Sequence, residues 1–144
     1  MKNIKIYLTI ICLCLMTVSC KSQNVKSNDK ADDPNTAAVY VSASSFNEQG
    51  TEVSYINTLT FSKDGSWLLH TNVKMPGNNQ DADCVAGTWT GDVTADGEVT
   101  LTKTKVIDND TGKLADYTSE DAAVTVTISG GKLTYEGAEY TKTK

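Results

Sequence analysis

Apolar and polar residues alternate along most of this chain after residue 36. Within 66–75, for example, Trp67, Leu69, Thr71 and Val73 alternate with Leu68, His70, Asn72 and Lys74. A period of two is typical of strands that bury one face. The pattern predicts about eight strands, at residues 37–43, 52–62, 66–75, 85–93, 98–107, 122–129, 132–136 and 138–142.

Short segments rich in glycine, aspartate and asparagine separate these predicted strands. They lie at residues 63–66, 95–98, 109–112 and 129–132. Asp-Gly and Gly-Gly favour tight hairpins, because glycine readily adopts the positive φ that such turns require. The connections are therefore expected to be antiparallel and mostly between neighbours in sequence. Only the segment 114–122 could form a short helix.

About eight antiparallel strands must cover their apolar face, either as a sandwich or as a closed barrel. Consecutive hairpins favour an up-and-down barrel. Val99 and Leu101 share one face, and continued alternation would place Lys103 and Lys105 inside, where unpaired charge is costly. The sequence therefore predicts either a β-bulge near 102–104 or a strand end that projects beyond the core.

The first twenty residues have the parts of a secretory signal. A lysine-containing start precedes an apolar run at 6–18, which is too short to span a bilayer comfortably. The motif Thr17-Val18-Ser19-Cys20 resembles the lipobox of bacterial lipoproteins, in which the cysteine becomes the lipid-modified first residue. The resemblance implies cleavage after residue 19 and acyl chains, such as palmitate, on Cys20. An ordinary cleaved signal and a retained membrane helix are the alternatives.

Three segments follow from this interpretation: a signal peptide at 1–19, the lipidated cysteine with a polar flexible linker at 20–36, and a barrel domain at 37–144. Removal of residues 1–19 leaves 11 lysines against 18 acidic residues, a formal charge of −7. An anionic membrane surface would not attract such a body, so acyl chains must hold it there. Lys21 replaces the aspartate that marks inner-membrane retention in enterobacterial lipoproteins, which implies the outer membrane of the bacterial envelope.

The amino-acid composition argues against several kinds of partner and binding site. The full chain has 13 lysines, no arginine and a formal charge of −5, which argues against nucleic acid as a partner. A single histidine, His70, rules out sites with several imidazole ligands. Because Cys12 and Cys14 lie in the signal and Cys20 carries lipid, only Cys84 remains, and no intramolecular disulfide is expected. Cys84 is either a partly buried small apolar residue or a reactive thiol.

Two groups of residues could form a catalytic or a metal-binding site. His70 and Cys84 could act as base and nucleophile, but His70 is predicted on the outer face and no nucleophile motif accompanies it. The run Asp108-Asn109-Asp110-Thr111-Gly112 looks like the beginning of a calcium loop, yet Ser119 stands where a bidentate glutamate is required. An Asx-rich turn is the simpler interpretation. We therefore expect no enzyme activity, metal or cofactor.

A second resemblance concerns the predicted barrel. The motif Phe61-Ser-Lys-Asp64-Gly65-Ser-Trp67, followed by Gly87-Thr88-Trp89, looks like the meander of bacterial lipocalin-like lipoproteins. The resemblance implies non-enzymatic binding of a small apolar ligand or an interaction role in the envelope. Inward-facing side chains form either the core or the wall of a ligand cavity. The candidate ligand-binding residues in the barrel interior are Tyr55, Phe61, Trp67, Leu69, Trp89 and Tyr135.

The alternative function is a surface module that binds a protein or a glycan. Its binding residues would lie in two polar segments, 75–83 and 108–118, which are expected to be loops.

Overall fold

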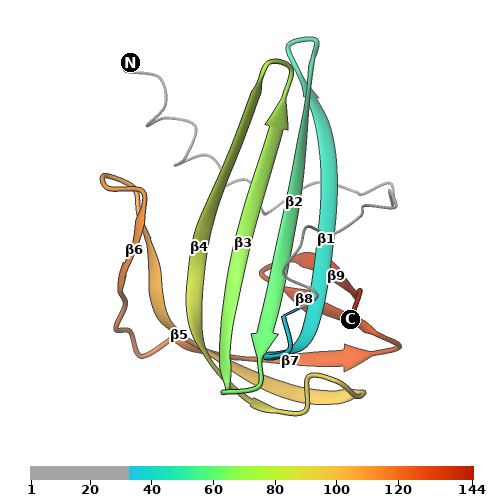
Figure 1. Cartoon of the computed structure of the whole chain (residues 1–144), viewed down its shortest axis with the longest axis vertical. Helices are drawn as coiled ribbons and strands as arrows, with labels where there is room; N and C mark the ends of the chain where they lie inside the picture. The colour runs from blue at the N-terminus through green and yellow to red at the C-terminus, as the bar shows by residue number, and fades with distance from the viewer. Residues whose placement is uncertain (1–32) are drawn as a thin grey trace.

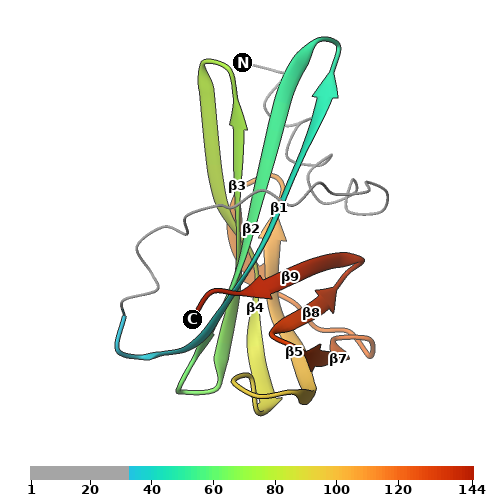
Figure 2. The same ribbon diagram turned by 90° about the vertical axis from the view of Figure 1, so that its right-hand side faces the viewer.

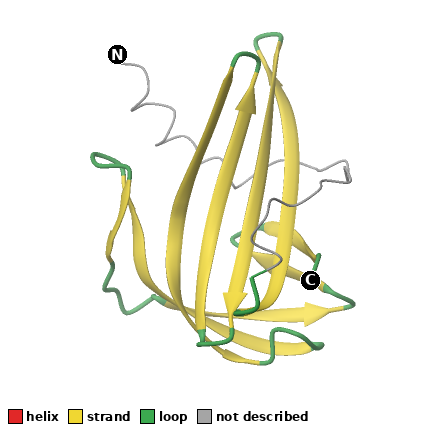
Figure 3. Cartoon of the chain, in the orientation of Figure 1, coloured by secondary structure: helices red, strands yellow, loops and turns green. Residues whose placement is uncertain are grey.

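The computed structural model describes residues 33–144, which fold into strands and turns without a helix (Figure 3). The predicted signal peptide, Cys20 and most of the 20–36 linker lie outside the described residues. All strand pairings are antiparallel, so the predicted all-β fold class is confirmed. The strands are β1 (Thr36–Glu48), β2 (Thr51–Ser62), β3 (Ser66–Met75), β4 (Asn78–Gly91), β5 (Gly97–Asp108), β6 (Lys113–Asp116), β7 (Ala123–Ser129), β8 (Lys132–Tyr135) and β9 (Ala138–Lys142).

The strands close into an up-and-down barrel, as predicted. The sheet order is β4-β3-β2-β1-β9-β8-β7-β5-β6, and pairing between β4 and β5 completes a ring of eight strands with β6 outside it. Two of the strand pairs in the ring have few pairing positions. Strands β1 and β9 pair at only two positions, Tyr40↔Lys142 and Val41↔Thr141, and β7 pairs with β8 only at Ile128↔Leu133 and Ser129↔Lys132.

Strands β1 to β4 extend well beyond the ring, and their two hairpins project together at one end of the molecule (Figures 1 and 2). Past Val41, β1 pairs only with β2 among the described strands, and the pairing of β4 with β5 begins at Val85. We call the four-stranded extension, residues 42–57 and 71–83, the open half, and the completed ring the closed half.

The two projecting hairpins have two-residue turns. Gln49 and Gly50 both have positive φ, 51° and 84°, as a type I′ turn requires. The other turn is Pro76-Gly77, with Gly77 at φ 76°. The predicted loop at 75–83 is therefore wrong, because Asn78–Gly91 is a strand paired with β3 from Met75↔Asn78 onward. Cross-strand pairing outweighs the low strand propensity of its asparagine, glutamine and aspartate residues.

Two other boundaries also differ from the sequence prediction. Strand β1 continues to Glu48, beyond the predicted end at residue 43. The short helix considered for 114–122 is not formed, because Lys113–Asp116 pairs with β5 as a short strand. Both segments are poor in apolar alternation, so backbone pairing determines their structure rather than side-chain burial.

The predicted bulge in β5 is confirmed. Gly87 is opposite Lys103 and Ala86 is opposite Lys105, which leaves Thr104 as the extra residue. The bulge shifts the alternation by one place beyond Lys103, which turns Lys105 out of the core. Lys103 precedes the extra residue and keeps the parity of Leu101, so its charge needs a partner instead. Lys105 is exposed, and the ammonium of the partly buried Lys103 forms an ion pair with the carboxylate of Glu136 at the β8–β9 turn.

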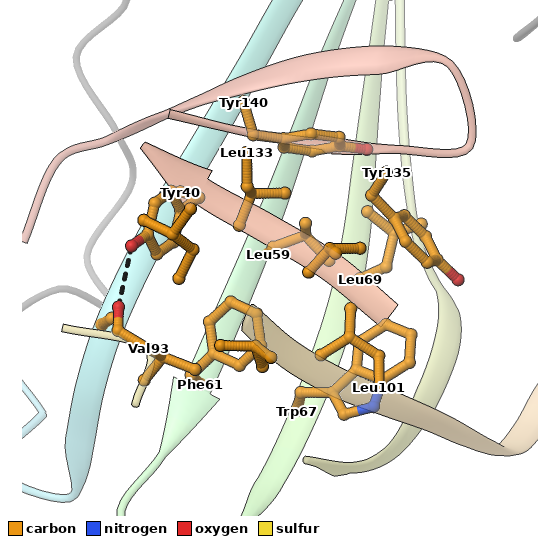
Figure 4. Close-up of a cluster of buried hydrophobic side chains, with 14 of the residues drawn as sticks. Tyr40, Leu59, Phe61, Trp67, Leu69, Val93, Leu101, Leu133, Tyr135 and Tyr140 are labelled. Carbon is orange, nitrogen blue, oxygen red and sulfur yellow. Dashed lines mark hydrogen bonds between the residues drawn. The ribbon is translucent and has the colours of Figure 1, made fainter. Parts of the chain in front are cut away.

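The interior of the closed half is filled by its own side chains (Figure 4). Tyr40 is fully buried, and its hydroxyl donates a hydrogen bond of 2.7 Å to the carbonyl oxygen of Val93. The Tyr40 ring meets Phe61 edge-on, with ring centroids 5.9 Å apart. The core cluster comprises Ala38, Tyr40, Leu59, Phe61, Trp67, Leu69, Cys84, Val93, Val99, Leu101, Val126, Ile128, Leu133, Tyr135 and Tyr140.

Candidate functional site

Four of the six predicted ligand-binding residues lie together in the core of the closed half. Phe61, Trp67, Leu69 and Tyr135 are each at most 4% exposed and belong to one cluster. The rings of Trp67 and Tyr135 meet edge-on at 5.6 Å between centroids. Rings at this separation are in direct contact, so these side chains pack against one another.

The environment of Tyr135 is both apolar and charged. Lys103 places its ammonium 5.8 Å from the centroid of the Tyr135 ring, and the same ammonium is paired with Glu136. Burial raises the pKa of the Tyr135 hydroxyl far above its usual value, and the negative charge of Glu136 raises it further. Burial likewise raises the pKa of Tyr140, with a smaller effect of Glu136. Both tyrosines therefore keep their protons at alkaline pH, where an exposed tyrosine ionises.

Trp89 lies at the edge of this cluster and is partly buried. Its indole N–H donates to the carbonyl oxygens of Ser62 and Ser66, at 3.2 Å and 3.1 Å. Its ring meets Phe61 edge-on, with centroids 6.1 Å apart. Because these carbonyls flank the β2–β3 turn, the two hydrogen bonds of Trp89 hold that turn against β4.

Tyr55, the sixth predicted residue, lies apart from the other five, in the open half. Its ring stacks on Phe46, with centroids 5.4 Å apart and planes at 16°. In the strand register Val53 is opposite Phe46, and Val73 is opposite Tyr55. Both valines are 4% exposed. The open half therefore has its own apolar group, with two partly exposed aromatic rings on the face that continues the barrel interior.

A buried polar layer separates this apolar group from the core of the closed half. Thr71 donates its hydroxyl to Oδ1 of Asn57 at 2.8 Å, and the two residues are 5% and 7% exposed. Ser42 is opposite Asn57 in the register and is 9% exposed. Sequence reasoning missed Asn57, although it has the same parity as Leu59 and Phe61 in β2. That parity was the available signal for an inward amide.

His70 and Cys84 are not arranged as base and nucleophile. His70 lies on the outer face, as predicted, with Nδ1 2.8 Å from Oδ1 of Asp83 and Nε2 3.8 Å from Oδ2 of Asp81. Cys84 belongs to the core cluster and is 6% exposed. Its thiol approaches the carbonyl oxygen of Ala82 at 3.7 Å. The imidazole is therefore directed to carboxylates outside the barrel, and the thiol is packed inside.

The segment that resembles a calcium loop is an Asx turn. Oδ1 of Asp108 accepts hydrogen bonds from the backbone N–H groups of Asp110 and Thr111, at 2.7 Å and 3.1 Å. This carboxylate oxygen is thus engaged by its own loop. Within residues 33–144, no group of three or more histidine, cysteine or acidic side chains could hold a metal ion. The same part of the chain contains no helix long and apolar enough to span a membrane.

Comparison with known proteins identifies no similar protein. No protein-family model matches the chain, and neither the curated proteins nor the solved structures give a match.

Proposed function

We propose that this protein is a lipid-anchored bacterial envelope protein whose lipocalin-like barrel works without catalysis, as an interaction module. Acyl chains on Cys20 would fix it to the membrane. The resemblance to bacterial lipoproteins favours the outer membrane. Two features support this: the lipobox-like motif at 17–20, and a closed antiparallel barrel of the type that the lipocalin resemblance implies.

The observation that carries the interaction role is the division between the two halves of the barrel. Phe61, Trp67, Leu69 and Tyr135, which would have to line an enclosed ligand site, are packed against one another. The open half, in contrast, combines partly exposed aromatic rings with strands that lack a described neighbour on one side. A surface of this kind suits contact with another molecule better than enclosure of one.

A small apolar or amphipathic ligand is the second candidate. The stacked rings of Phe46 and Tyr55, together with Val53 and Val73, provide an apolar group next to the polar Asn57–Thr71 layer. Such a combination would accept a molecule with one apolar and one polar part. This version moves the ligand site from the closed half to the open half and keeps only Tyr55 of the six predicted residues.

Binding of a protein or glycan through loops has less support. The segment 75–83 is largely strand, with a turn of only two residues. In the segment 108–118, strands β5 and β6 leave a short turn at 109–112 and a few residues after Asp116.

The anchor is tested by mass spectrometry of the N-terminal fragment of the protein purified from its own membrane. We expect a fragment that begins at Cys20 and carries acyl mass. Cys20→Ser should retain residues 1–19 and carry no acyl chain, whereas Cys14→Ser, within the apolar run, should be processed normally. An unacylated Cys20 in the wild-type protein would refute the proposed anchor.

The same preparation, kept native, distinguishes the two candidate functions. A retained small molecule that is lost in Tyr55→Ser would support the ligand-binding candidate. A protein partner, cross-linked through a photoreactive residue at position 55 but not through one at the exposed position 118, would support the interaction module. If position 55 cross-links no partner and no small molecule is retained, the proposed role of the open half is wrong.

A further inference from the structure

One edge of strand β1 has backbone groups that no other strand within the described residues pairs with. Its pairing with β2 runs the full length of the strand, from Thr36↔Ser62 to Glu48↔Thr51. On the other side, β9 pairs only at Tyr40 and Val41, and the C-terminal residues continue along Val39. From Ser42 to Asn47 no strand within residues 33–144 covers this edge (Figure 1).

The hydrogen bonds of Val39 show which residues point their backbone groups towards this edge. The Val39 N–H donates to the carbonyl oxygen of Lys144 at 3.2 Å, and the Thr143 N–H donates to the Val39 carbonyl oxygen at 2.8 Å. Alternate residues of a strand bond to the same neighbour. Hence Ala43, Ser45 and Asn47 direct their N–H and C=O groups to the uncovered side.

The two edges of the open half differ in how they are protected. Between Ser42 and Asn47, β1 has no charged residue and no proline, and Ser45 and Asn47 are exposed. The corresponding part of β4 carries Asp81 and Asp83, and charged side chains on an edge discourage added strands. The β1 edge is therefore the one of the two that is open to a further strand.

We propose that the β1 edge from Ser42 to Asn47 accepts an extended, basic segment of a partner protein as an additional antiparallel or parallel strand. The proposal rests on the interaction role proposed above and names its contact site. Backbone groups repeated along an edge bind an extended chain, while side-chain pockets or patches give preference. Here Phe46, stacked on Tyr55, would receive apolar side chains on the inner face of the added strand.

Charge favours a basic segment over a second copy of this chain. Residues 33–144 contain 8 lysines and 16 acidic residues, a formal charge of −8. A partner rich in lysine or arginine would be attracted to this domain, whereas two copies would repel each other.

The test uses the protein purified from its own membrane in non-ionic detergent and a fluorescent synthetic peptide of alternating lysine and valine. We expect saturable binding by fluorescence anisotropy, weakened about tenfold in Ser45→Pro, because proline removes one edge N–H and obstructs a close approach. Asn79→Pro, on the edge of β4, is the matched control and should bind as the wild type does. Both substitutions should be tolerated in the fold, because each removed N–H points away from the neighbouring strand.

Two further measurements separate strand addition from simple charge attraction. The peptide should slow amide hydrogen exchange at Ala43, Ser45 and Asn47 but not at Asn79, and a peptide with alternate N-methylated amides should bind about tenfold more weakly. Equal binding by the N-methylated peptide, or by Ser45→Pro, would overturn the proposal.

The remaining outcome concerns self-association. Protection of the same three amides by raising the protein concentration alone would identify a second copy as the occupant and overturn the assignment to a basic partner. None of these results depends on acylation of Cys20. Failure of the edge proposal is therefore distinguishable from failure of the proposed anchor.

Discussion

Trp67 and Gly87 are opposite each other in the β3–β4 ladder, and the indole occupies the space that a side chain at position 87 would need. A Cβ atom on Gly87 would lie 2.8 Å from Nε1 of Trp67 and 1.9 Å from the carbonyl oxygen of Thr102. The buried indole and the approach of β5 to β4 therefore both depend on the absence of a side chain at this position.

We expect Gly87→Ala to destabilise the protein by about 3 kcal/mol, because both close neighbours are held by the core and by backbone pairing. The measurement is urea unfolding followed by tryptophan fluorescence. Thr88→Ala, at the exposed neighbouring position, should change the unfolding free energy by less than about 0.5 kcal/mol. An equally small effect of Gly87→Ala would show that β5 can move away without cost.

Tyr40→Phe should lower the unfolding free energy by about 1–3 kcal/mol, because it leaves the buried carbonyl oxygen of Val93 without its donor. Tyr117→Phe, at a partly exposed tyrosine, serves as the control. Amide exchange around residues 92–97 should also accelerate in Tyr40→Phe, since the hydroxyl ties this turn to β1. Unchanged exchange there would mean that the β4–β5 turn is held by other contacts.

Stability should fall in alkaline solution through Tyr135 and Tyr140. Their pKa values are raised in the folded state from the ordinary value of 10.0, mainly by burial. The folded protein thus keeps protons that the unfolded chain loses, so the stabilisation is complete below pH 10 and declines above it. Each of these two tyrosines contributes about 1.4 kcal/mol per pH unit to the slope, and Tyr40, whose pKa is also raised by burial, adds to it. Urea unfolding between about pH 9 and 11.5 measures the slope, and Tyr140→Phe should lower it by about 1.4 kcal/mol per pH unit.

The ion pair between Lys103 and Glu136 should contribute about 1 kcal/mol of coupling free energy in a double-mutant cycle with Lys103→Met and Glu136→Gln. Its side chains are 22% and 36% exposed. The pair Lys132–Glu139 has an N–O distance of 2.8 Å but side chains 55% and 60% exposed, and it is the matched comparison. Its coupling should be smaller, because solvent screens it more strongly. Equal coupling for both pairs would contradict a role for burial at the β5 bulge.

Strands β2 and β3, which run through both halves, could be predicted from the sequence because they alternate strongly. The predicted strand at 66–75 coincides with β3, and the one at 52–62 differs from β2 by one residue. The bulge in β5 was also predictable, because Lys103 and Lys105 could not both face the core. In these segments the apolar residues that are buried also follow the alternation that strand pairing imposes.

The outer two strands of the open half could not be predicted in the same way. The second part of β1 and the first part of β4 consist largely of serine, asparagine, glutamine and aspartate, so burial leaves no periodic pattern in them. Their structure comes from tight turns that continue the ladders of β2 and β3. For the candidate site, alternation correctly placed Tyr55 on the inner side of its strand. Alternation specifies the face of a sheet but not the height along the barrel, and so it did not separate Tyr55 from the five residues of the closed half.

The place where the chain joins the barrel determines how a membrane-bound molecule would present itself. The chain reaches β1 beside the β2–β3 turn, where the backbone N–H of Lys63 donates to the carbonyl oxygen of Asn35 at 2.8 Å. From there β1 runs 13 residues to the opposite pole. At about 3.3 Å per residue this is a span of roughly 40 Å. A tether upstream of β1 would therefore leave the uncovered backbone and the stacked aromatic rings at the end of the domain farthest from the lipid surface.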